Sequence, residues 1–176
     1  MTKKAAVFLD RDGVINKKMP EDDYVKEWEE FIFLPGVFEA VSNIKGKGYL
    51  IIIITNQRCI ARNIIDEDTL RGIHEKMVSE IQKHGGHIDS IYFCPHNIDD
   101  NCKCRKPEIG MISNALADFK KVDIEIDLEK SYMVGDSEKD IKAGNSAGVK
   151  TIRIGKKISI ADFASNSLLD AVKFLQ

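Results

Sequence analysis

Apolar residues follow two patterns along this chain: short unbroken runs, and longer segments in which they recur every three or four positions. The runs at residues 5–9 and 49–54 contain only apolar side chains. Such runs are typical of strands that are covered on both faces of a parallel sheet. Shorter or more mixed runs predict three further strands, at residues 90–93, 131–134 and 150–154.

Segments with helical periodicity separate these runs. Five helices are predicted. The first begins after Pro35-Gly36, the second runs from a cap at Asp66 to about His84, and the third begins at Pro107. The last two cover about residues 139–147 and 168–175. Strands that alternate with helices over short connections form a parallel sheet with right-handed crossovers. We therefore expect a single α/β domain over residues 1–176. It would be a Rossmann-like parallel sheet of about five main strands with helices on both faces.

Polar clusters follow three of the predicted strands. They lie at residues 10–12, 55–58 and 135–137. The carboxyl ends of parallel strands share one edge, and ligands of such sheets bind there. The three clusters are therefore expected to converge on one site, although they are far apart in the sequence.

Asp10 and Asp12 follow the first predicted strand, directly before Gly13. If the chain stays extended, both side chains point to the same side. At about 4 Å two carboxylates repel each other by about 4 kcal/mol for an effective dielectric constant of about 20, and a divalent cation such as Mg²⁺ would offset this. One aspartate can then attack phosphorus while the other moves protons as general acid and base. Taken alone, the motif also fits a solvated acidic turn.

The other two clusters supply groups that complement a phosphorylated ligand. Thr55 and Asn56 offer donors for a phosphoryl oxygen, although an ordinary turn has the same composition. Asp136 offers a third carboxylate that would complete a Mg²⁺ shell with Asp10, or else caps the following helix. His74 lies inside a predicted helix, where a lone histidine is more often packed or solvated than a ligand.

Residues 17–34 show no periodicity and contain charged and aromatic side chains, among them Tyr24 and Trp28. An irregular segment of this length in a small domain is usually functional. We expect it to lie as a loop over the exit of the first strand. The alternative is a peripheral flap with a short hairpin.

Three thiols and one imidazole lie within eleven residues, as Cys94, His96, Cys102 and Cys104. Four such ligands make a closed tetrahedral shell for a structural Zn²⁺ ion. Ile98 is the one apolar side chain that could stabilise this loop otherwise, so chance clustering is the weaker alternative. The sequence therefore predicts a zinc-bound loop.

Arg105 and Lys106 follow this loop directly. A metal-bound loop would direct both cations at the strand ends. There Lys106 could neutralise a transferred phosphoryl group while Arg105 binds a second anionic group. Cys59, the fourth cysteine, has no histidine beside it and is interpreted as non-catalytic, although it could be an oxidisable thiol near the pocket.

Composition narrows the class of protein further. The 176 residues are 43% hydrophobic, and 26 basic against 28 acidic residues give a net charge of −2. This balance gives no general attraction to nucleic acid or to an anionic membrane. The chain has no run of 18 apolar residues, and its first apolar run is too short for a signal peptide core. We therefore expect a cytoplasmic monomer that binds a small phosphorylated substrate, no nucleic acid and no membrane.

Four motifs occur together in this chain: D-x-D-G at 10–13, a strand-terminal Thr55, Lys106, and G-D-x-x-x-D at 135–140. In this combination the chain resembles the haloacid dehalogenase superfamily. More closely it resembles the branch that contains heptose 1,7-bisphosphate phosphatases and histidinol-phosphate phosphatases. The matching stretches span nearly the whole chain, at 10–16, 55–57, 60–62, 94–96, 102–107 and 110–111.

The resemblance implies a Mg²⁺-dependent phosphatase without a large cap domain, with the zinc-bound loop near the active site. Asp10 would be the nucleophile and Asp12 the general acid and base. The Mg²⁺ ion would bind the Asp10 carboxylate, the main-chain carbonyl of Asp12, and Asp136. Thr55 and Lys106 would hold the transferred phosphoryl group.

For the rest of the substrate, the resemblance implies recognition by Arg105. Tyr24, Asn56, Gln57 and Arg58 would line the pocket. The expected substrate is D-glycero-D-manno-heptose 1,7-bisphosphate, which would lose its C7 phosphate.

The chain departs from the branch at several positions near this pocket. Arg58, Cys59 and Asn63 replace small residues, and Ser137 stands where the heptose enzymes often carry lysine. Because these positions bear on the substrate, histidinol phosphate stays open as an alternative. A catalytically silent, zinc-stabilised binding module is a further alternative. A nucleic-acid 3′-phosphatase is disfavoured because the chain has no extended basic stripe with interleaved aromatic residues.

Overall fold

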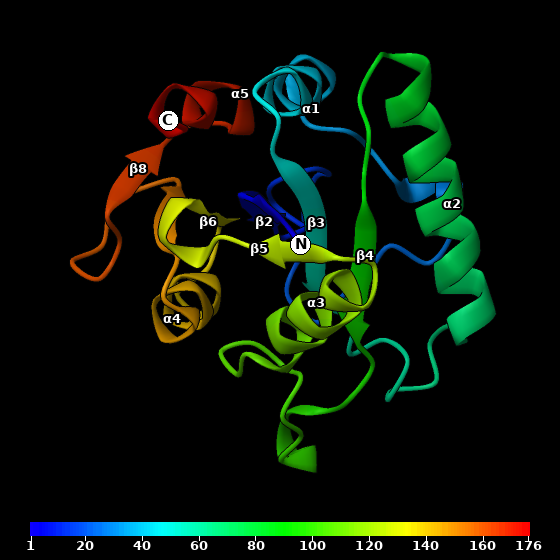
Figure 1. Ribbon diagram of the computed structural model, residues 1–176. Helices are drawn as coiled ribbons and strands as arrows, with labels where there is room; N and C mark the ends of the chain where they lie inside the picture. Colours follow the sequence, from blue (N-terminus) through cyan, green and yellow to red (C-terminus); the bar gives the residue numbers. More distant parts are fainter.

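Six parallel strands form the central sheet of the computed structural model, which describes residues 1–176. In spatial order they are β4, β3, β2, β6, β7 and β8 (Figure 1). Their bounds are β2 Ala6–Leu9, β3 Leu50–Asn56, β4 Ser90–Cys94, β6 Tyr132–Gly135, β7 Lys150–Ile154 and β8 Phe163–Ser165. The α/β class and the parallel sheet are as predicted, and five of the six strands are the predicted ones.

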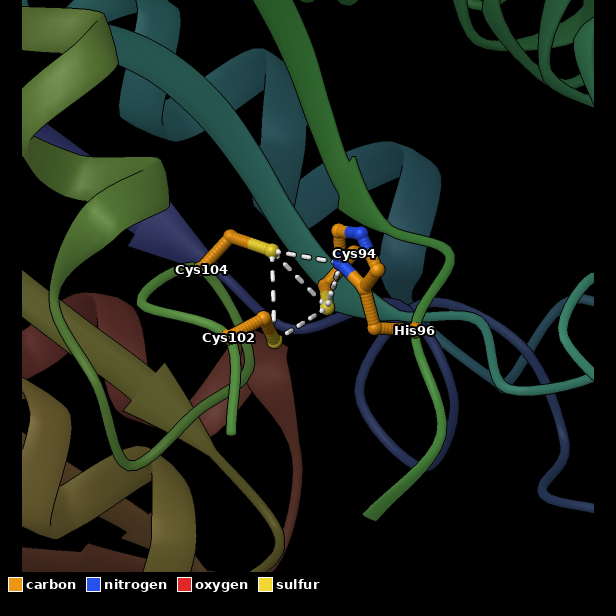
Figure 2. A group of neighbouring side chains, drawn as sticks. All are labelled: Cys94, His96, Cys102 and Cys104. Carbon is orange, nitrogen blue, oxygen red and sulfur yellow. Dashed lines mark hydrogen bonds between the residues drawn. The ribbon is translucent and has the colours of Figure 1, made fainter. Parts of the chain in front are cut away.

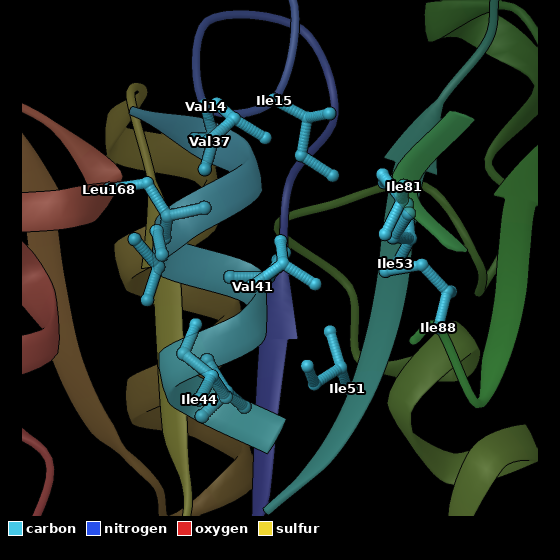
Figure 3. Close-up of a cluster of buried hydrophobic side chains, with 14 of the residues drawn as sticks. Val14, Ile15, Val37, Val41, Ile44, Ile51, Ile53, Ile81, Ile88 and Leu168 are labelled. Carbon is cyan, nitrogen blue, oxygen red and sulfur yellow. The ribbon is translucent and has the colours of Figure 1, made fainter. Parts of the chain in front are cut away.

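Helices cover both faces of the sheet. They are α1 Val37–Gly46, α2 Glu67–Lys83, α3 Gly110–Lys121, α4 Glu138–Ala147 and α5 Leu168–Ala171. Side chains of α1, α2 and α5 pack in one cluster with Val7, Leu9, Ile51 and Ile53, which point to one face of β2 and β3. Figure 3 shows α1 with Val37, Val41 and Ile44 lying against these strands. The alternate side chains, Ala6, Phe8, Ile52 and Ile54, pack under α3 on the opposite face.

Three strands were not predicted because they are too short or too polar for the pattern to reveal them. β1, Thr2–Lys4, is exposed throughout and pairs in parallel with β5, Ile124–Ile126, in a separate two-stranded sheet. β8 pairs with β7 over three residues and makes a sixth strand at the edge of the main sheet. Their pairing depends on distant segments, which local periodicity does not encode.

Two predicted helix boundaries were wrong. The helix expected from Pro107 begins at Gly110, because residues 105–109 turn back on the cysteine loop. The Gly110 amide donates to the Lys103 carbonyl over 2.9 Å, and a Cβ at Gly110 would lie 2.3 Å from that oxygen. The helix expected over 168–175 ends at Ala171 and continues as a tighter 3-10 turn, Val172–Phe174. The predicted cap of α2 is confirmed, since the Asp66 side chain accepts from the Thr69 amide at 2.8 Å.

Residues 17–34 form the expected irregular loop, with one 3-10 turn at Trp28–Glu30. Trp28 stacks on Phe31 with their ring centroids 5.2 Å apart. The loop lies over the carboxyl edge of the sheet, where residues 18–25 line the main cavity. None of the helices is long and apolar enough to cross a lipid bilayer.

Candidate active site

A cavity of about 620 Å³ opens at the carboxyl edge of the sheet. Groups from six separate segments line it: the turn after β2, the loop 18–25, the end of β3 and the turn after it at Asn56 and Arg58, Ile98, the pair Arg105 and Lys106, and the turn from β6 into α4. The predicted residues among them are Asp10, Asp12, Tyr24, Asn56, Arg58, Arg105, Lys106 and Asp136. The polar clusters that follow the strands therefore converge as the parallel topology requires.

Lys106 lies at the floor of this cavity between two carboxylates. Its Nζ is 2.9 Å from Asp10 Oδ1 and 2.7 Å from Asp140 Oδ1, and it donates to the Ile54 carbonyl at 2.8 Å. The side chain is only 3% exposed. Burial opposes its charge, but the two carboxylates outweigh burial and raise the pKa of Lys106. The ammonium therefore stays charged beside Asp10.

Asp10 is buried beside the negative charges of Asp140 and Asp12 and the positive charge of Lys106. Burial, followed by the charge of Asp140, raises the pKa of Asp10 to about 7, although Lys106 acts in the opposite direction. A second cation would stabilise the ionised carboxylate. Such an ion would lie where Asp10, Asp136 and Asp140 each offer an oxygen, since these oxygens lie within 4.8 Å of one another.

Asp136 has the free oxygen that such a cation site requires. Its Oδ1 is buried and has no hydrogen-bond partner, while its Oδ2 accepts from Lys18 Nζ at 2.8 Å. The helix cap is Ser137, not Asp136, and the Ser137 amide and hydroxyl both donate to Asp140 Oδ2. Asp140 is thus committed to Lys106 and the α4 cap, and Asp10 with Asp136 fit a hard divalent cation.

Gly13 allows the turn after β2 to approach Asp136. Its φ is +89°, and a Cβ there would lie 2.5 Å from Asp136 Oδ2. A larger side chain would displace the carboxylate. The glycine of the D-x-D-G motif is therefore required for both the backbone conformation and the space.

Asp12 does not share its surroundings with Asp10 as an extended chain would require. The backbone turns after Asp10, with the Ile15 amide donating to the Arg11 carbonyl at 2.8 Å. The Asp12 carboxylate faces Arg11, Asn16 and Gln57 instead. Burial works against its ionisation, but Arg11 and the two amides lower the pKa of Asp12. The expected mutual repulsion is therefore offset by a separate cation for each aspartate: Lys106 and Arg11.

Thr55 and Gln57 lie beneath the cavity and do not line it. Thr55 is buried, and its Oγ1 accepts from Gln57 Nε2 at 2.8 Å. Asn56 lines the cavity and supports Lys106, because its amide exchanges hydrogen bonds with the Lys106 main chain at 3.0 and 3.1 Å. The T-N-Q segment therefore fixes both Asp12 and Lys106.

Arginines from two segments face the loop over the cavity. Arg58 Nε donates to Asn97 Oδ1 at 2.6 Å, and its Nη1 lies 3.5 Å from Asp22 Oδ1. Arg62 Nη1 lies 3.1 Å from the same carboxylate oxygen. Arg105 also lines the cavity, and its Nη1 donates to the His96 carbonyl at 3.4 Å. These arginines share the cavity with acidic residues of the loop, and Asp22 pairs with both Arg58 and Arg62.

The predicted cysteine and histidine cluster is assembled beside this entrance. Figure 2 shows the sulfur atoms of Cys94, Cys102 and Cys104 converging on His96 Nδ1. All four ligand atoms lie within 4.8 Å of one another, and the three sulfur atoms are 3.0 to 3.6 Å apart. A tetrahedral ion with Zn–S bonds of about 2.3 Å needs sulfur atoms about 3.8 Å apart. The four ligands fit a zinc ion after small adjustments.

Cys59 is separate from this cluster. It is fully buried, and burial raises the pKa of its thiol. It is therefore not a reactive thiol at the pocket.

Sequence reasoning missed two charged residues at the site and the pairing of a third. Arg11 lies between the two aspartates of the motif and is 1% exposed. Its position in a buried motif was a signal that it needs an internal partner. Lys18 gave no signal, because its contact with Asp136 joins residues 118 positions apart. Asp140 ends the G-D-x-x-x-D motif noted in the sequence, but its pairing with Lys106 was not foreseen.

The chain matches a known protein family over residues 5–169, that of the polynucleotide kinase 3 phosphatases. The chain belongs to this family. A relative from Haemophilus ducreyi, named D-glycero-beta-D-manno-heptose-1,7-bisphosphate 7-phosphatase, is 38% identical over 98% of both chains. A relative from Burkholderia mallei, named as the 7-phosphatase of the alpha anomer, is 44% identical over 85% of this chain and 78% of its own.

Solved structures agree with this membership. The D,D-heptose 1,7-bisphosphate phosphatase from B. bronchiseptica, solved with magnesium and phosphate, is 32% identical. It superposes with a TM-score of 0.84 over 99% of this chain and 98% of its own. A haloacid dehalogenase superfamily hydrolase from Geobacter sulfurreducens shares the fold at 16% identity, with a TM-score of 0.65. The predicted resemblance to heptose 1,7-bisphosphate phosphatases is therefore confirmed, and the fold is the one seen in the haloacid dehalogenase superfamily hydrolase.

Proposed function

We propose that this protein is a Mg²⁺-dependent phosphatase that removes the C7 phosphate from D-glycero-D-manno-heptose 1,7-bisphosphate. The observation that carries the proposal is the floor of the cavity. There the Asp10 carboxylate lies 2.9 Å from the Lys106 ammonium, and a buried oxygen of Asp136 has no partner. A nucleophile, a fixed positive charge and a free hard ligand are the groups that phosphoryl transfer needs.

The reaction proceeds in two displacements at phosphorus. An oxygen of Asp10 attacks the C7 phosphorus, the bond from phosphorus to the sugar oxygen breaks, and Asp12 gives that oxygen a proton. Water then attacks the phosphorus of the aspartyl phosphate, the bond to Asp10 breaks, and Asp12 takes the proton from water. Lys106 holds the phosphoryl oxygens throughout, and inorganic phosphate leaves.

Two metal ions accompany this chemistry. Asp10, Asp136 and the main-chain carbonyl of Asp12 would hold Mg²⁺, which neutralises negative charge on the phosphoryl group when bound. Cys94, His96, Cys102 and Cys104 would hold a structural Zn²⁺ that fixes the segment leading to Arg105 and Lys106. The B. bronchiseptica relative, whose structure contains magnesium and phosphate, supports the first assignment.

Recognition of the second phosphate falls to the entrance of the cavity. Arg105 and Arg58 line it, with Tyr24 and Asn56 beside them. These arginines exceed what one phosphate needs, and they suit a substrate with a second anionic group. Thr55 and Gln57 would act from beneath by holding the residues that touch the substrate.

The name of the family, polynucleotide kinase 3 phosphatase, would by itself favour a nucleic-acid substrate. The net charge of −2 offers no extended attraction for a polyanion. The relatives at 38% and 44% identity are named for a sugar bisphosphate. We therefore propose a monomer that acts on a small sugar phosphate and binds no nucleic acid.

Steady-state kinetics on three substrates tests this function. Phosphate release is measured with heptose 1,7-bisphosphate, histidinol phosphate and a 3′-phosphorylated oligonucleotide, each with Mg²⁺. We expect the highest kcat/KM for the heptose bisphosphate, with loss of the C7 phosphate visible by phosphorus NMR. A preference for histidinol phosphate or the oligonucleotide would overturn the substrate assignment. Phosphate release that survives in Asp10→Asn would overturn the mechanism.

A further inference from the structure

Both oxygens of the Asp12 carboxylate accept hydrogen bonds from neighbouring side chains. Arg11 Nη2 donates to both oxygens, at 2.8 and 3.0 Å. Asn16 donates to Oδ1 at 2.9 Å, and Gln57 donates to Oδ2 at 3.0 Å. Two of these partners are neutral amides, so Arg11 alone supplies positive charge to this carboxylate.

Arg11 is itself held away from solvent by two further groups. Its guanidinium carbon lies 5.8 Å from the centre of the Phe31 ring, and its Nη1 lies 3.1 Å from His74 Nε2. The Arg11 side chain is 1% exposed, and its Nε has no partner. His74 is therefore the one hydrogen-bonding group that fixes the end of the guanidinium away from Asp12.

The chemistry of this contact fixes the state of His74. A guanidinium can only donate, so His74 Nε2 must accept and cannot carry a proton. The imidazole is 5% exposed and arises from α2, a helix that contributes no residue to the lining of the cavity. A carboxylate at this position would form an ion pair with Arg11 and weaken the pairing of Arg11 with Asp12. A neutral imidazole orients Arg11 and leaves its charge to Asp12.

We propose that His74 is a positioning residue for the reaction: it orients Arg11, which in turn holds the Asp12 carboxylate for proton transfer. This inference rests on the proposed function, in which Asp12 gives a proton to the sugar oxygen as the bond from phosphorus to that oxygen breaks. Negative charge grows on Asp12 at that moment, and a guanidinium already in place stabilises it without rearrangement.

The consequence of losing His74 depends on the leaving group. A sugar oxygen needs a proton to depart, so the step from free enzyme to aspartyl phosphate becomes slower when Asp12 is poorly held. The nitrophenolate of p-nitrophenyl phosphate departs without a proton, so the same step does not depend on Asp12. A merely structural role of His74 would change both substrates by the same factor.

The test compares His74→Met with His74→Gln. Both substituents are unbranched, similar in length and compatible with a helix, but only glutamine offers Arg11 a strong acceptor. We expect His74→Met to lower kcat/KM for the heptose bisphosphate at least about tenfold, which is part of the effect typical of general acid catalysis. For p-nitrophenyl phosphate, kcat/KM should fall by less than about twofold. KM should stay within about twofold, so the loss falls on kcat. His74→Gln should recover most of the lost rate.

Three results would overturn the inference. These are equal losses on both substrates, no loss on either, and failure of glutamine to recover more activity than methionine. Wild-type protein without activity on the sugar bisphosphate would instead overturn the proposed function, and the inference with it. If His74→Met does not fold, Arg11→Lys makes the same test from the other partner, because an ammonium cannot span Asp12 and His74 together. It should then show the same selective loss on the sugar substrate.

Discussion

Each ionised side chain at the floor of the cavity is buried beside a group of opposite charge. Lys106 pairs with Asp10 and Asp140, and Arg11 pairs with Asp12. Removing either cation would leave a buried carboxylate without compensation, whereas Lys106 stays paired with Asp140 when Asp10 loses its charge. The charged groups that would take part in the reaction are therefore held in place by their ion-pair partners.

Asp10→Asn is expected to abolish phosphate release and, in buffer without Mg²⁺, to stabilise the fold. The pKa of Asp10 rises from 3.8 to about 7 on folding, mainly by burial and then by Asp140. Between these values the folded protein binds a proton that the unfolded chain has lost, so wild-type stability falls as pH rises, by up to about 1.4 kcal/mol per pH unit. Asparagine does not titrate, so the stability of Asp10→Asn does not fall with pH for this reason.

Urea unfolding at about pH 5 and about pH 8 measures the difference between the two proteins. The free energy of unfolding of Asp10→Asn should increase relative to that of wild type at the higher pH. A variant that is less stable than wild type at about pH 8 would show that Asp10 is not a strained carboxylate.

His74 should give the opposite dependence of stability on pH. Burial, and then Arg11, lower the pKa of His74 from 6.5 to about 3. Between these values the unfolded chain binds the proton and the folded protein does not, so this residue makes stability fall as pH falls below about 6.5. His74→Gln removes that loss.

The difference in unfolding free energy between His74→Gln and wild type, followed from about pH 7 to about pH 5, checks this prediction. It should grow in favour of the variant by up to about 1.4 kcal/mol per pH unit. A constant difference would mean that His74 is protonated in the fold. Because Asp10 and His74 act in opposite directions in one pH window, wild-type stability alone would not reveal either.

At the scale of elements, the turns carry the chemistry and the cysteine loop fixes two of its cations. The loop leads directly into Arg105 and Lys106, and its Asn97 accepts from Arg58. The metal ligands come from β4 and the segment that follows it (Figure 2). Zinc binding therefore couples the folding of this loop to the placement of Lys106.

Purified protein should contain about one zinc ion per chain, and Cys102→Ser should lower both zinc content and the free energy of unfolding. Elemental analysis and urea unfolding provide the two measurements. Cys59→Ser is the matched control, because the same chemical change lies outside the cluster and should leave zinc content unchanged. Equal zinc content in the two variants would contradict the assignment of the ligands.

The sequence pattern was sufficient for the elements whose signal is local. Unbroken apolar runs revealed β2 and β3, and the Asp66 cap revealed the start of α2. Gly110 shows the limit of such reasoning. Its contact with Lys103, seven residues earlier, decides where α3 begins, while Pro107 suggested an earlier start.

For the site, the sequence was sufficient to gather the residues but not to pair them. A parallel sheet brings the polar ends of β2, β3 and β6 to one edge whatever the details of the turns. Which cation meets which carboxylate depends on the turn at Arg11 and on the length of Lys106. For that reason the Arg11 contacts with Asp12 and His74 were visible only in the structure.

At the scale of the whole molecule, one sheet edge holds a nucleophile, its cation and a free metal ligand beneath an arginine-rich entrance. Elements from both halves of the chain contribute, since Asp10 directly follows β2 while β6 and α4 flank Asp136 (Figure 1). The central claim is that phosphoryl transfer passes through the Asp10 carboxylate at this edge.

Trapping the covalent intermediate tests that claim most directly. The protein is mixed with heptose bisphosphate and Mg²⁺, quenched in acid during turnover, and digested for mass spectrometry. We predict one added phosphoryl group, located on Asp10 and missing in Asp10→Asn. A phosphoryl group on any other residue, or turnover by Asp10→Asn at the wild-type rate, would contradict the account.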